Sequence, residues 1–276
     1  MSQVLGHRAT RVVAAAKLHR AAGRARSGRF LAEGPNLVEA AGRRGLIREL
    51  YATAAAADRH ADLLADQRVP VQLVTDRAAA SLSDTVTPAG LVAVCALPRP
   101  ALAEVLAGAP ALVAVAVGIA EPGNAGTLIR LADAMGADAV LLAGHTVDPY
   151  NGKCLRASAG SIFAIPVIPV ADTTAALAAL RDGGLRLLAT TLDGETTLDD
   201  AEALLAAPTA WLFGPEAHGL PESVAAAADH RIRIPMAGAA ESLNVAAAAA
   251  ICLYASARAT RVRPRPSRPG RSPDRW

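Results

Sequence analysis

The residues best suited to chemistry lie in three loops, each of which follows an apolar run. The first loop carries Asn124 and continues to Arg130, the second carries Glu216, and the third carries Ser242 and Asn244. Ligands of open α/β sheets bind where strands end, so these side chains are candidates for ligand binding. Each also has an ordinary structural interpretation, since Asn, Ser and Glu can cap helices and an arginine can form a surface ion pair.

The common phosphate-binding and nucleophile motifs are missing. No G-x-G-x-x-G follows a strand, Gly152-Lys153 has Val147 where a P-loop needs glycine, and neither G-x-S-x-G nor H-E-x-x-H occurs. The three cysteines are far apart and lack zinc-ligand spacing, which favours a reducing compartment and no metal. The chain must therefore bind its ligand without a standard glycine fingerprint.

The elements that must position the three loops read as alternating strands and helices. From residue 111 on, short apolar runs alternate with helical segments, which predicts a parallel sheet with helices on both faces. The expected strands are 112–117, 139–142, 165–168, 185–190, 209–213 and 230–234, and the expected helices are 125–135, 151–159, 173–182, 221–228 and 243–258.

The first hundred residues read as a smaller α/β unit, followed by a linker that begins at Pro98-Arg-Pro100. Prolines among arginines predict a disordered tail from residue 261. The expected helices of the small unit are 11–24, 35–42 and 58–67, and its expected strands are 29–34, 46–52, 69–74 and 91–97. The expected domains are 1–98, a linker at 99–107, 108–260 and the tail at 261–276.

Positive charge is concentrated at the two ends of the chain. Residues 1–30 contain Lys and Arg but no acidic residue, residues 258–276 are rich in Arg, and the middle is net acidic. Basic ends on an acidic body indicate contact with a polyanion such as nucleic acid, although Arg-rich ends can also be solubilising tails. No signal peptide and no run long enough for a membrane span is evident, so we expect a cytoplasmic protein.

Together and in this order, the three loops resemble the signature motifs of the SpoU (TrmH-type) family of RNA ribose 2′-O-methyltransferases, in the SPOUT superfamily. The resemblance rests on N-A-G-T-L-I-R at 124–130, F-G-P-E-A-H-G-L at 213–220, and I-P-M followed by E-S-L-N-V-A-A-A at 234–248. The segment 148–160 is also similar. With F-L-A-E-G at 30–34 and T-V-T-P-A-G at 85–90, the first hundred residues resemble the L30e-like substrate-binding domain of the rRNA-modifying branch, which includes thiostrepton-resistance methyltransferases.

The resemblance implies an N-terminal L30e-like domain and a C-terminal SPOUT α/β domain with a deep trefoil knot. It also implies a homodimer packed through the catalytic domains, RNA as the substrate, and S-adenosylmethionine bound in the knot. By their positions in the motifs, the cofactor-binding residues would be Thr190, Gly214, Glu216, Ile234, Met236, Ser242 and Leu243.

The reaction implied is in-line transfer of a sulfonium methyl group to a ribose 2′-hydroxyl, which is a poor nucleophile at neutral pH. The resemblance nominates Arg130, supplied across the dimer interface, to act on that hydroxyl. Because a guanidinium stays protonated, we expect Arg130 to clamp the adjacent phosphate and stabilise the developing alkoxide, while a phosphate oxygen or water takes the proton. Asn124, Ser242 and Asn244 would orient the ribose and Arg130, and Glu216 would organise the site.

Two other functions stay open on the sequence. One is a 2′-O-methyltransferase that acts on tRNA rather than on 23S rRNA, and the other is a non-catalytic RNA-binding or ribosome-assembly factor with the same fold. The L30e-like domain favours rRNA, because such domains suit structured loops, where RNA recognition concentrates. The presence of all the nominated residues favours an enzyme.

Overall fold

The computed structural model describes residues 4–262, so nearly all of the tail expected at 261–276 lies outside the described residues. The chain divides into two compact units. The first contains Met1–Pro98 together with Asp148–Phe163, and the second contains Arg99–Val147 together with the chain from Ala164 onward. The segment 148–163, expected within the second domain at 108–260, is therefore part of the first unit.

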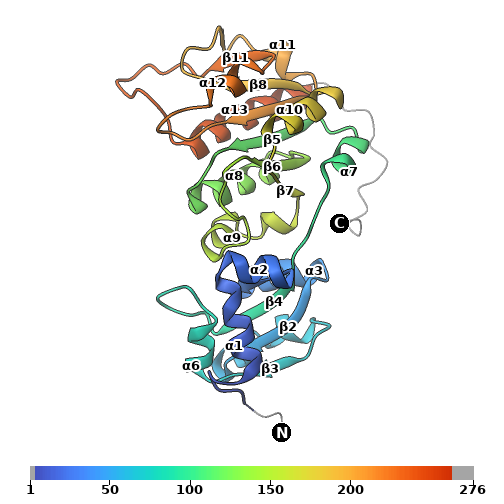
Figure 1. The fold of residues 1–276 in the computed structure, drawn as a ribbon, viewed down its shortest axis with the longest axis vertical. Coiled ribbons are helices and arrows are strands. Elements are labelled where there is room, and N and C mark those ends of the chain that lie inside the picture. Colours follow the sequence, from blue (N-terminus) through green and yellow to red (C-terminus); the bar gives the residue numbers. More distant parts are fainter. Residues whose placement is uncertain (1–3, 263–276) are drawn as a thin grey trace. The chain divides into compact units, whose positions relative to one another are not determined.

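The first unit is built on a four-stranded sheet in the order β1-β4-β2-β3 (Figure 1). β4 pairs antiparallel with β1 and β2, and β3 pairs parallel with β2. The strands are β1 (Arg29–Glu33), β2 (Ile47–Ala52), β3 (Val71–Leu73) and β4 (Leu91–Ala96). The helices are α1 (Thr10–Ala16), η1 (Lys17–His19), α2 (Ala21–Ser27), α3 (Pro35–Arg43), α4 (Ala54–Arg59), α5 (Ala61–Ala65), α6 (Asp76–Ser81), α9 (Gly152–Ser158) and η2 (Ser161–Phe163).

The segment 148–163 joins the first unit through two ion pairs, of which Arg24–Asp148 is the more buried, and a small aromatic cluster. Arg24 is 5% exposed, and its guanidinium donates to Asp148 Oδ2 at 2.7 Å and to the carbonyls of Leu18 and His19 at 2.9 Å. The ring of Phe30 lies 4.9 Å from that of Tyr150 between centroids. These contacts explain why the segment packs with the first unit, although the alternation of strands and helices predicted that it belongs to the domain at 108–260.

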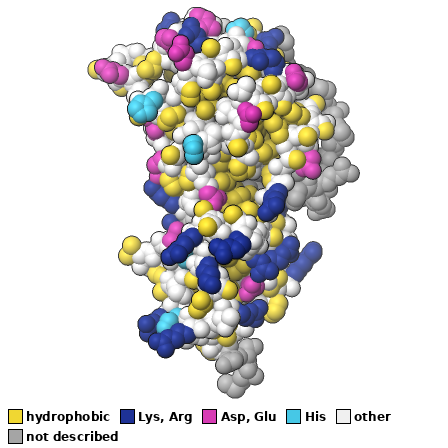
Figure 2. Space-filling view, viewed as in Figure 1, with side chains coloured by type: hydrophobic (Ala, Val, Ile, Leu, Met, Phe, Trp, Pro, Cys, Tyr) yellow, Lys and Arg dark blue, Asp and Glu magenta, His cyan; other side chains and the backbone are white. Residues whose placement is uncertain are grey.

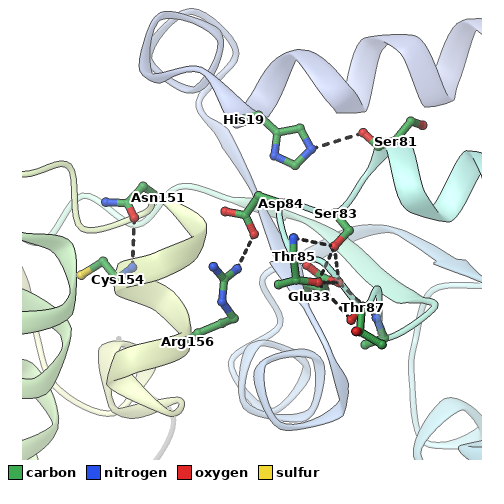
Figure 3. Close-up of polar contacts among 11 residues, drawn as sticks. His19, Glu33, Ser81, Ser83, Asp84, Thr85, Thr87, Asn151, Cys154 and Arg156 are labelled. Atoms are coloured by element: carbon green, nitrogen blue, oxygen red, sulfur yellow. Dashed lines mark hydrogen bonds and ion pairs between the residues drawn. The ribbon is translucent and has the colours of Figure 1, made fainter.

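The two segments that carry the resemblance in the first unit contact each other directly. The carboxylate of Glu33, at the end of β1, accepts from Ser83 Oγ at 2.6 Å and from the backbone N–H of Ala89 at 3.2 Å (Figure 3). Beside this loop, Asp84 pairs with Arg156 of α9. The loop before β4 is thus held in place by the end of β1.

The second unit contains a seven-stranded sheet in the order β7-β6-β5-β10-β8-β11-β9, in which every neighbouring pair is parallel. The prediction of a parallel α/β sheet is confirmed. The strands are β5 (Leu112–Val117), β6 (Ala139–Ala143), β7 (Val167–Val170), β8 (Arg186–Thr190), β9 (Thr196–Thr197), β10 (Thr209–Phe213) and β11 (His230–Arg233). The helices are α7 (Leu102–Ala107), α8 (Pro122–Ala134), α10 (Thr173–Asp182), α11 (Glu202–Leu205), α12 (Glu222–Ala226) and α13 (Val245–Val262).

Alternate side chains of the central strand β10 face the two helical layers. Ala210 and Leu212 belong to a core shared with α7, α10 and α12. On the other face, Trp211 Nε1 donates to Ser256 Oγ of α13 at 2.8 Å, and α13 packs along α8. The strand therefore separates two apolar layers, and the three loops emerge at the carboxyl edge of the sheet.

Several elements differ from the sequence-based expectation. The helix expected over 58–67 is two short helices, α4 and α5, and α6 was not expected. Thr53 caps the start of α4 and Thr75 caps the start of α6. In each case the threonine hydroxyl accepts from the backbone N–H of the residue three positions further along. The expected linker at 99–107 contains α7. Within residues 4–262, no helix has both the length and the apolar character that a membrane span requires.

Candidate functional site

One carboxylate oxygen brings the three loops together. Oε1 of Glu216, which follows β10, accepts from Asn124 Nδ2 at 2.9 Å and from Asn244 Nδ2 at 2.6 Å. Asn244 Nδ2 also lies 3.1 Å from Asn124 Oδ1. Residues more than a hundred positions apart in the sequence therefore meet at the carboxyl edge of the sheet.

The capping interpretation holds for Asn244 but is wrong for Asn124. Asn244 Oδ1 accepts from the N–H groups of Ala246 at 2.9 Å and Ala247 at 3.4 Å, so it caps α13. Glu216 Oε1 accepts from the first N–H of that helix, Val245 N, at 3.2 Å. In α8 the cap is Glu121, whose carboxylate accepts from Asn124 N at 2.7 Å. The carboxamide of Asn124 is left for Glu216.

Arg130 is exposed on α8, six residues beyond Asn124. The residues just before it, Leu128 and Ile129, are fully buried and anchor the helix. Among the described residues, Arg130 forms no hydrogen bond and no ion pair, so the expected alternative of a surface salt bridge is not observed. Its guanidinium remains able to bind an anion.

A cleft of about 850 Å³ opens beside this junction, between the ends of β8, β10 and β11 and the loops that follow them. All seven residues nominated for cofactor binding line it: Thr190, Gly214, Glu216, Ile234, Met236, Ser242 and Leu243. Asn124, Asn244 and Arg130 are not among the lining residues. Glu216 and Ser242 are therefore the nominated residues common to the cleft and the catalytic set.

The sequence did not indicate a charged cluster on the wall of the cleft. Arg231, in β11, donates through Nε to Glu195 Oε2 at 3.1 Å and through Nη1 to Asp193 Oδ2 at 3.3 Å. A hydrogen bond from the backbone N–H of Arg231 is the main cause that lowers the pKa of Glu195. Asp193 and Arg231 line the cleft. The sequence did not identify them, because charged residues of both signs are common in loops that follow strands.

Backbone segments pass very close to one another at this edge. A Cβ atom on Gly214 would lie 2.5 Å from the backbone of Gly219 and Leu220. A Cβ on Gly194 would lie 2.7 Å from the backbone nitrogen of Arg233. Only glycine fits at these two positions, and Gly214 is one of the residues predicted to offer backbone groups to a ligand.

Comparison with known proteins identifies close relatives. Residues 111–254 match the SpoU rRNA Methylase family model, and residues 9–93 match the MRM3-like substrate binding domain. The chain is 34% identical over 248 residues to the 23S rRNA (guanosine(2553)-2′-O)-methyltransferase RlmP of Bacillus subtilis, covering 86% of this chain and 92% of that protein.

Two solved structures with bound AdoMet are also similar. The SpoU methyltransferase AviRb from Streptomyces viridochromogenes, in complex with the cofactor AdoMet, superposes with a TM-score of 0.80 at 30% identity, covering 92% of this chain and 99% of that chain. An AdoMet-bound rRNA methyltransferase from Sinorhizobium meliloti gives a TM-score of 0.78 at 29% identity, covering 91% and 95%. The similarity thus extends over both units.

The junction at Glu216 predicts a specific stability effect. In Glu216→Ala, two carboxamides and one helix N–H lose their shared acceptor, and we expect the free energy of unfolding to fall by about 1–2 kcal/mol. Urea unfolding followed by tryptophan fluorescence measures it. The control is Glu241→Ala, an exposed carboxylate with no partner among the described residues, which we expect to change stability by less than about 0.5 kcal/mol. Equal effects of the two substitutions would contradict a structural role for the junction.

Proposed function

Because the chain belongs to the SpoU rRNA methylase family, we propose that it transfers the methyl group of S-adenosylmethionine to a ribose 2′-hydroxyl of 23S rRNA. The observation that carries this proposal is the carboxylate junction of Glu216, which joins all three family motifs beside a cleft large enough for a nucleoside cofactor.

The residues that line the cleft fit S-adenosylmethionine. The cofactor has no phosphate, so it needs no glycine-rich phosphate loop. Gly214, Ile234 and Leu243, the residues predicted to hold it by backbone groups, all line the cleft. Met236 and Ile234 add apolar surface for the adenine. When bound, S-adenosylmethionine supplies a methyl group activated by the positive sulfur. Within residues 4–262, no group of His, Cys, Asp and Glu is arranged to hold a metal ion.

In the proposed mechanism, Arg130 acts on the RNA. Its guanidinium holds the phosphate next to the target ribose and stabilises negative charge as it develops on the 2′-oxygen. A phosphate oxygen or water takes the proton, because a guanidinium cannot accept one. Asn124 and Asn244, fixed by Glu216, and Ser242 orient the ribose. Holding the reacting atoms in line supplies much of the rate enhancement.

Arg130→Ala tests this mechanism and the function itself. We expect methyl transfer to 23S rRNA to fall by at least about 100-fold, because the alkoxide loses its main charged donor, while cofactor affinity stays within about tenfold. Transfer of tritium from labelled S-adenosylmethionine measures the reaction, and calorimetry measures affinity. The control is Arg186→Ala, an exposed arginine at the amino end of β8. Turnover retained in Arg130→Ala would refute the role, and no transfer by the unmodified chain to either rRNA or tRNA would refute the enzyme.

We propose that the first unit supplies the electrostatic contact with RNA. Lys and Arg side chains gather over this unit on the face shown in Figure 2. Lys17, Arg20 and Arg26 are exposed and have no partner among the described residues. Val12 and Leu18, in contrast, are buried in the core of the unit, so residues 4–30 are not a detachable arm. Substitution of single charges is therefore a cleaner experiment than truncation.

The triple substitution Lys17→Gln, Arg20→Gln and Arg26→Gln tests that contact. If each cation contacts a phosphate, we expect the slope of log affinity against log salt to become shallower by about 2 for the three changes together, because fewer counterions are released. Filter binding to 23S rRNA fragments at several salt concentrations measures the slope. A triple Arg→Gln substitution of Arg99, Arg186 and Arg233, which are exposed and belong to the second unit, removes the same charge elsewhere. The same slope for both triple variants would mean that the N-terminal helices do not contact RNA.

We also propose that the chain is a homodimer that packs through its second unit. Ile251 and Tyr254 are 39% and 53% exposed, and they lie three residues apart on one face of α13. This helix packs along α8, which carries Arg130, so the exposed face and Arg130 belong to neighbouring helices. A dimer that packs through this region would allow Arg130 of one protomer to act in the site of its partner.

The double substitution Ile251→Glu and Tyr254→Glu tests the interface. We expect the mass in solution to halve, because two charges would be buried in an apolar contact. Size-exclusion chromatography with light scattering measures the mass. Val13→Glu, at an exposed apolar residue of the first unit, is the control and should leave the mass unchanged. An unmodified chain that is monomeric at micromolar concentration would overturn the proposal.

Two further expectations follow from the family and stay predictions. The trefoil knot is supported by the close backbone approach at Gly194, which places the segment after β8 against β11. A cytoplasmic location is supported by the proposed rRNA substrate.

A further inference from the structure

One buried hydroxyl in the described residues has no hydrogen-bond partner. It is Oγ1 of Thr191, the residue that directly follows β8. A buried polar atom without a partner is costly, and most such atoms in proteins are satisfied by protein, water or a ligand. Thr191 also lines the cleft at the carboxyl edge of the sheet. The unsatisfied atom therefore belongs to the wall of the proposed cofactor site.

The backbone around Thr191 is fixed by its neighbours. The N–H of Thr191 donates to the carbonyl of Ile232 at 3.1 Å, which ties it to β11. The preceding hydroxyl, that of Thr190, donates to the carbonyl of Leu212 at 2.9 Å and so ties β8 to β10. Of the two adjacent threonines, Thr190 thus uses its hydroxyl within the sheet, and Thr191 is the one whose hydroxyl is left for a ligand.

The charged groups nearby do not account for this hydroxyl. Asp193 and Glu195 are both engaged by Arg231. A neutral hydroxyl can donate or accept, which suits the polar atoms of an uncharged nucleoside or of an amino-acid moiety.

We propose that the Thr191 hydroxyl hydrogen-bonds a polar atom of bound S-adenosylmethionine, which makes Thr191 a further cofactor-binding residue. The proposal rests on the proposed function. It also assigns separate tasks to the adjacent threonines, since the Thr190 hydroxyl holds the strand and the Thr191 hydroxyl holds the cofactor.

Thr191→Val and Thr191→Ser distinguish ligand binding from a structural role. Valine keeps the shape and removes the hydroxyl, so we expect affinity for S-adenosylmethionine and S-adenosylhomocysteine to fall about 3- to 10-fold. The melting temperature without ligand should not fall, because no protein hydrogen bond is lost. Serine keeps the hydroxyl and should retain affinity within about twofold. Calorimetry and thermal melting of the full chain supply both readouts.

Thr197→Val is the matched control in the same unit. Thr197 lies in β9, outside the lining of the cleft, and its hydroxyl bonds Asp200. We expect the opposite pattern, a lower melting temperature with unchanged affinity. Unchanged affinity of Thr191→Val would overturn the inference while leaving the proposed function intact. A folded unmodified chain that binds neither ligand would overturn both.

Discussion

The hydrogen bonds to Glu216 Oε1 are the constraint on which the site depends. That oxygen accepts from two carboxamides and from the first N–H of α13. The N–H groups at a helix start carry partial positive charge and need acceptors, so a carboxylate placed there stabilises the helix and also fixes the two asparagines. Removing this carboxylate would take away an acceptor that groups of all three loops share, since Asn124 and Asn244 come from the other two loops.

The sequence predicted most of the second unit because buried parallel strands have a strong signal. Leu112–Val117 and Thr209–Phe213 have the predicted bounds, and both are wholly apolar or nearly so. β9 was missed, since two threonines in a loop carry no periodicity. The segment 148–163 packs with the first unit although the family match over 111–254 includes it. A pattern of alternating elements says nothing about a long-range contact such as that between Arg24 and Asp148.

The sequence predicted the lining of the cleft better than it predicted the roles of individual polar side chains. All seven residues that motif resemblance nominated for the cofactor line the cleft, at the end of β8 or in the loops that follow β10 and β11. The residue types alone gave two interpretations of Asn124, capping or ligand orientation, and only the position of Glu121 decided between them. Thr191 was not nominated from the sequence. The Thr190 hydroxyl has a hydrogen-bond partner and the Thr191 hydroxyl has none, and a sequence does not show this difference.

The absence of a glycine fingerprint now has a physical explanation under the proposed function. A phosphate loop uses helix dipoles and successive N–H groups to offset concentrated negative charge. S-adenosylmethionine carries a positive sulfur and no phosphate, so such a loop would offer the wrong potential. The lining of the cleft contains three carboxylates, Asp193, Glu216 and Glu222, against one arginine, Arg231, and this net negative charge suits a cation better. The positive groups, Arg130 and those of the first unit, are left to the RNA, which is the anionic partner. Under the proposed function, charge is thus divided by ligand: the net acidic cleft takes the cationic cofactor, and the exposed arginines take the polyanion.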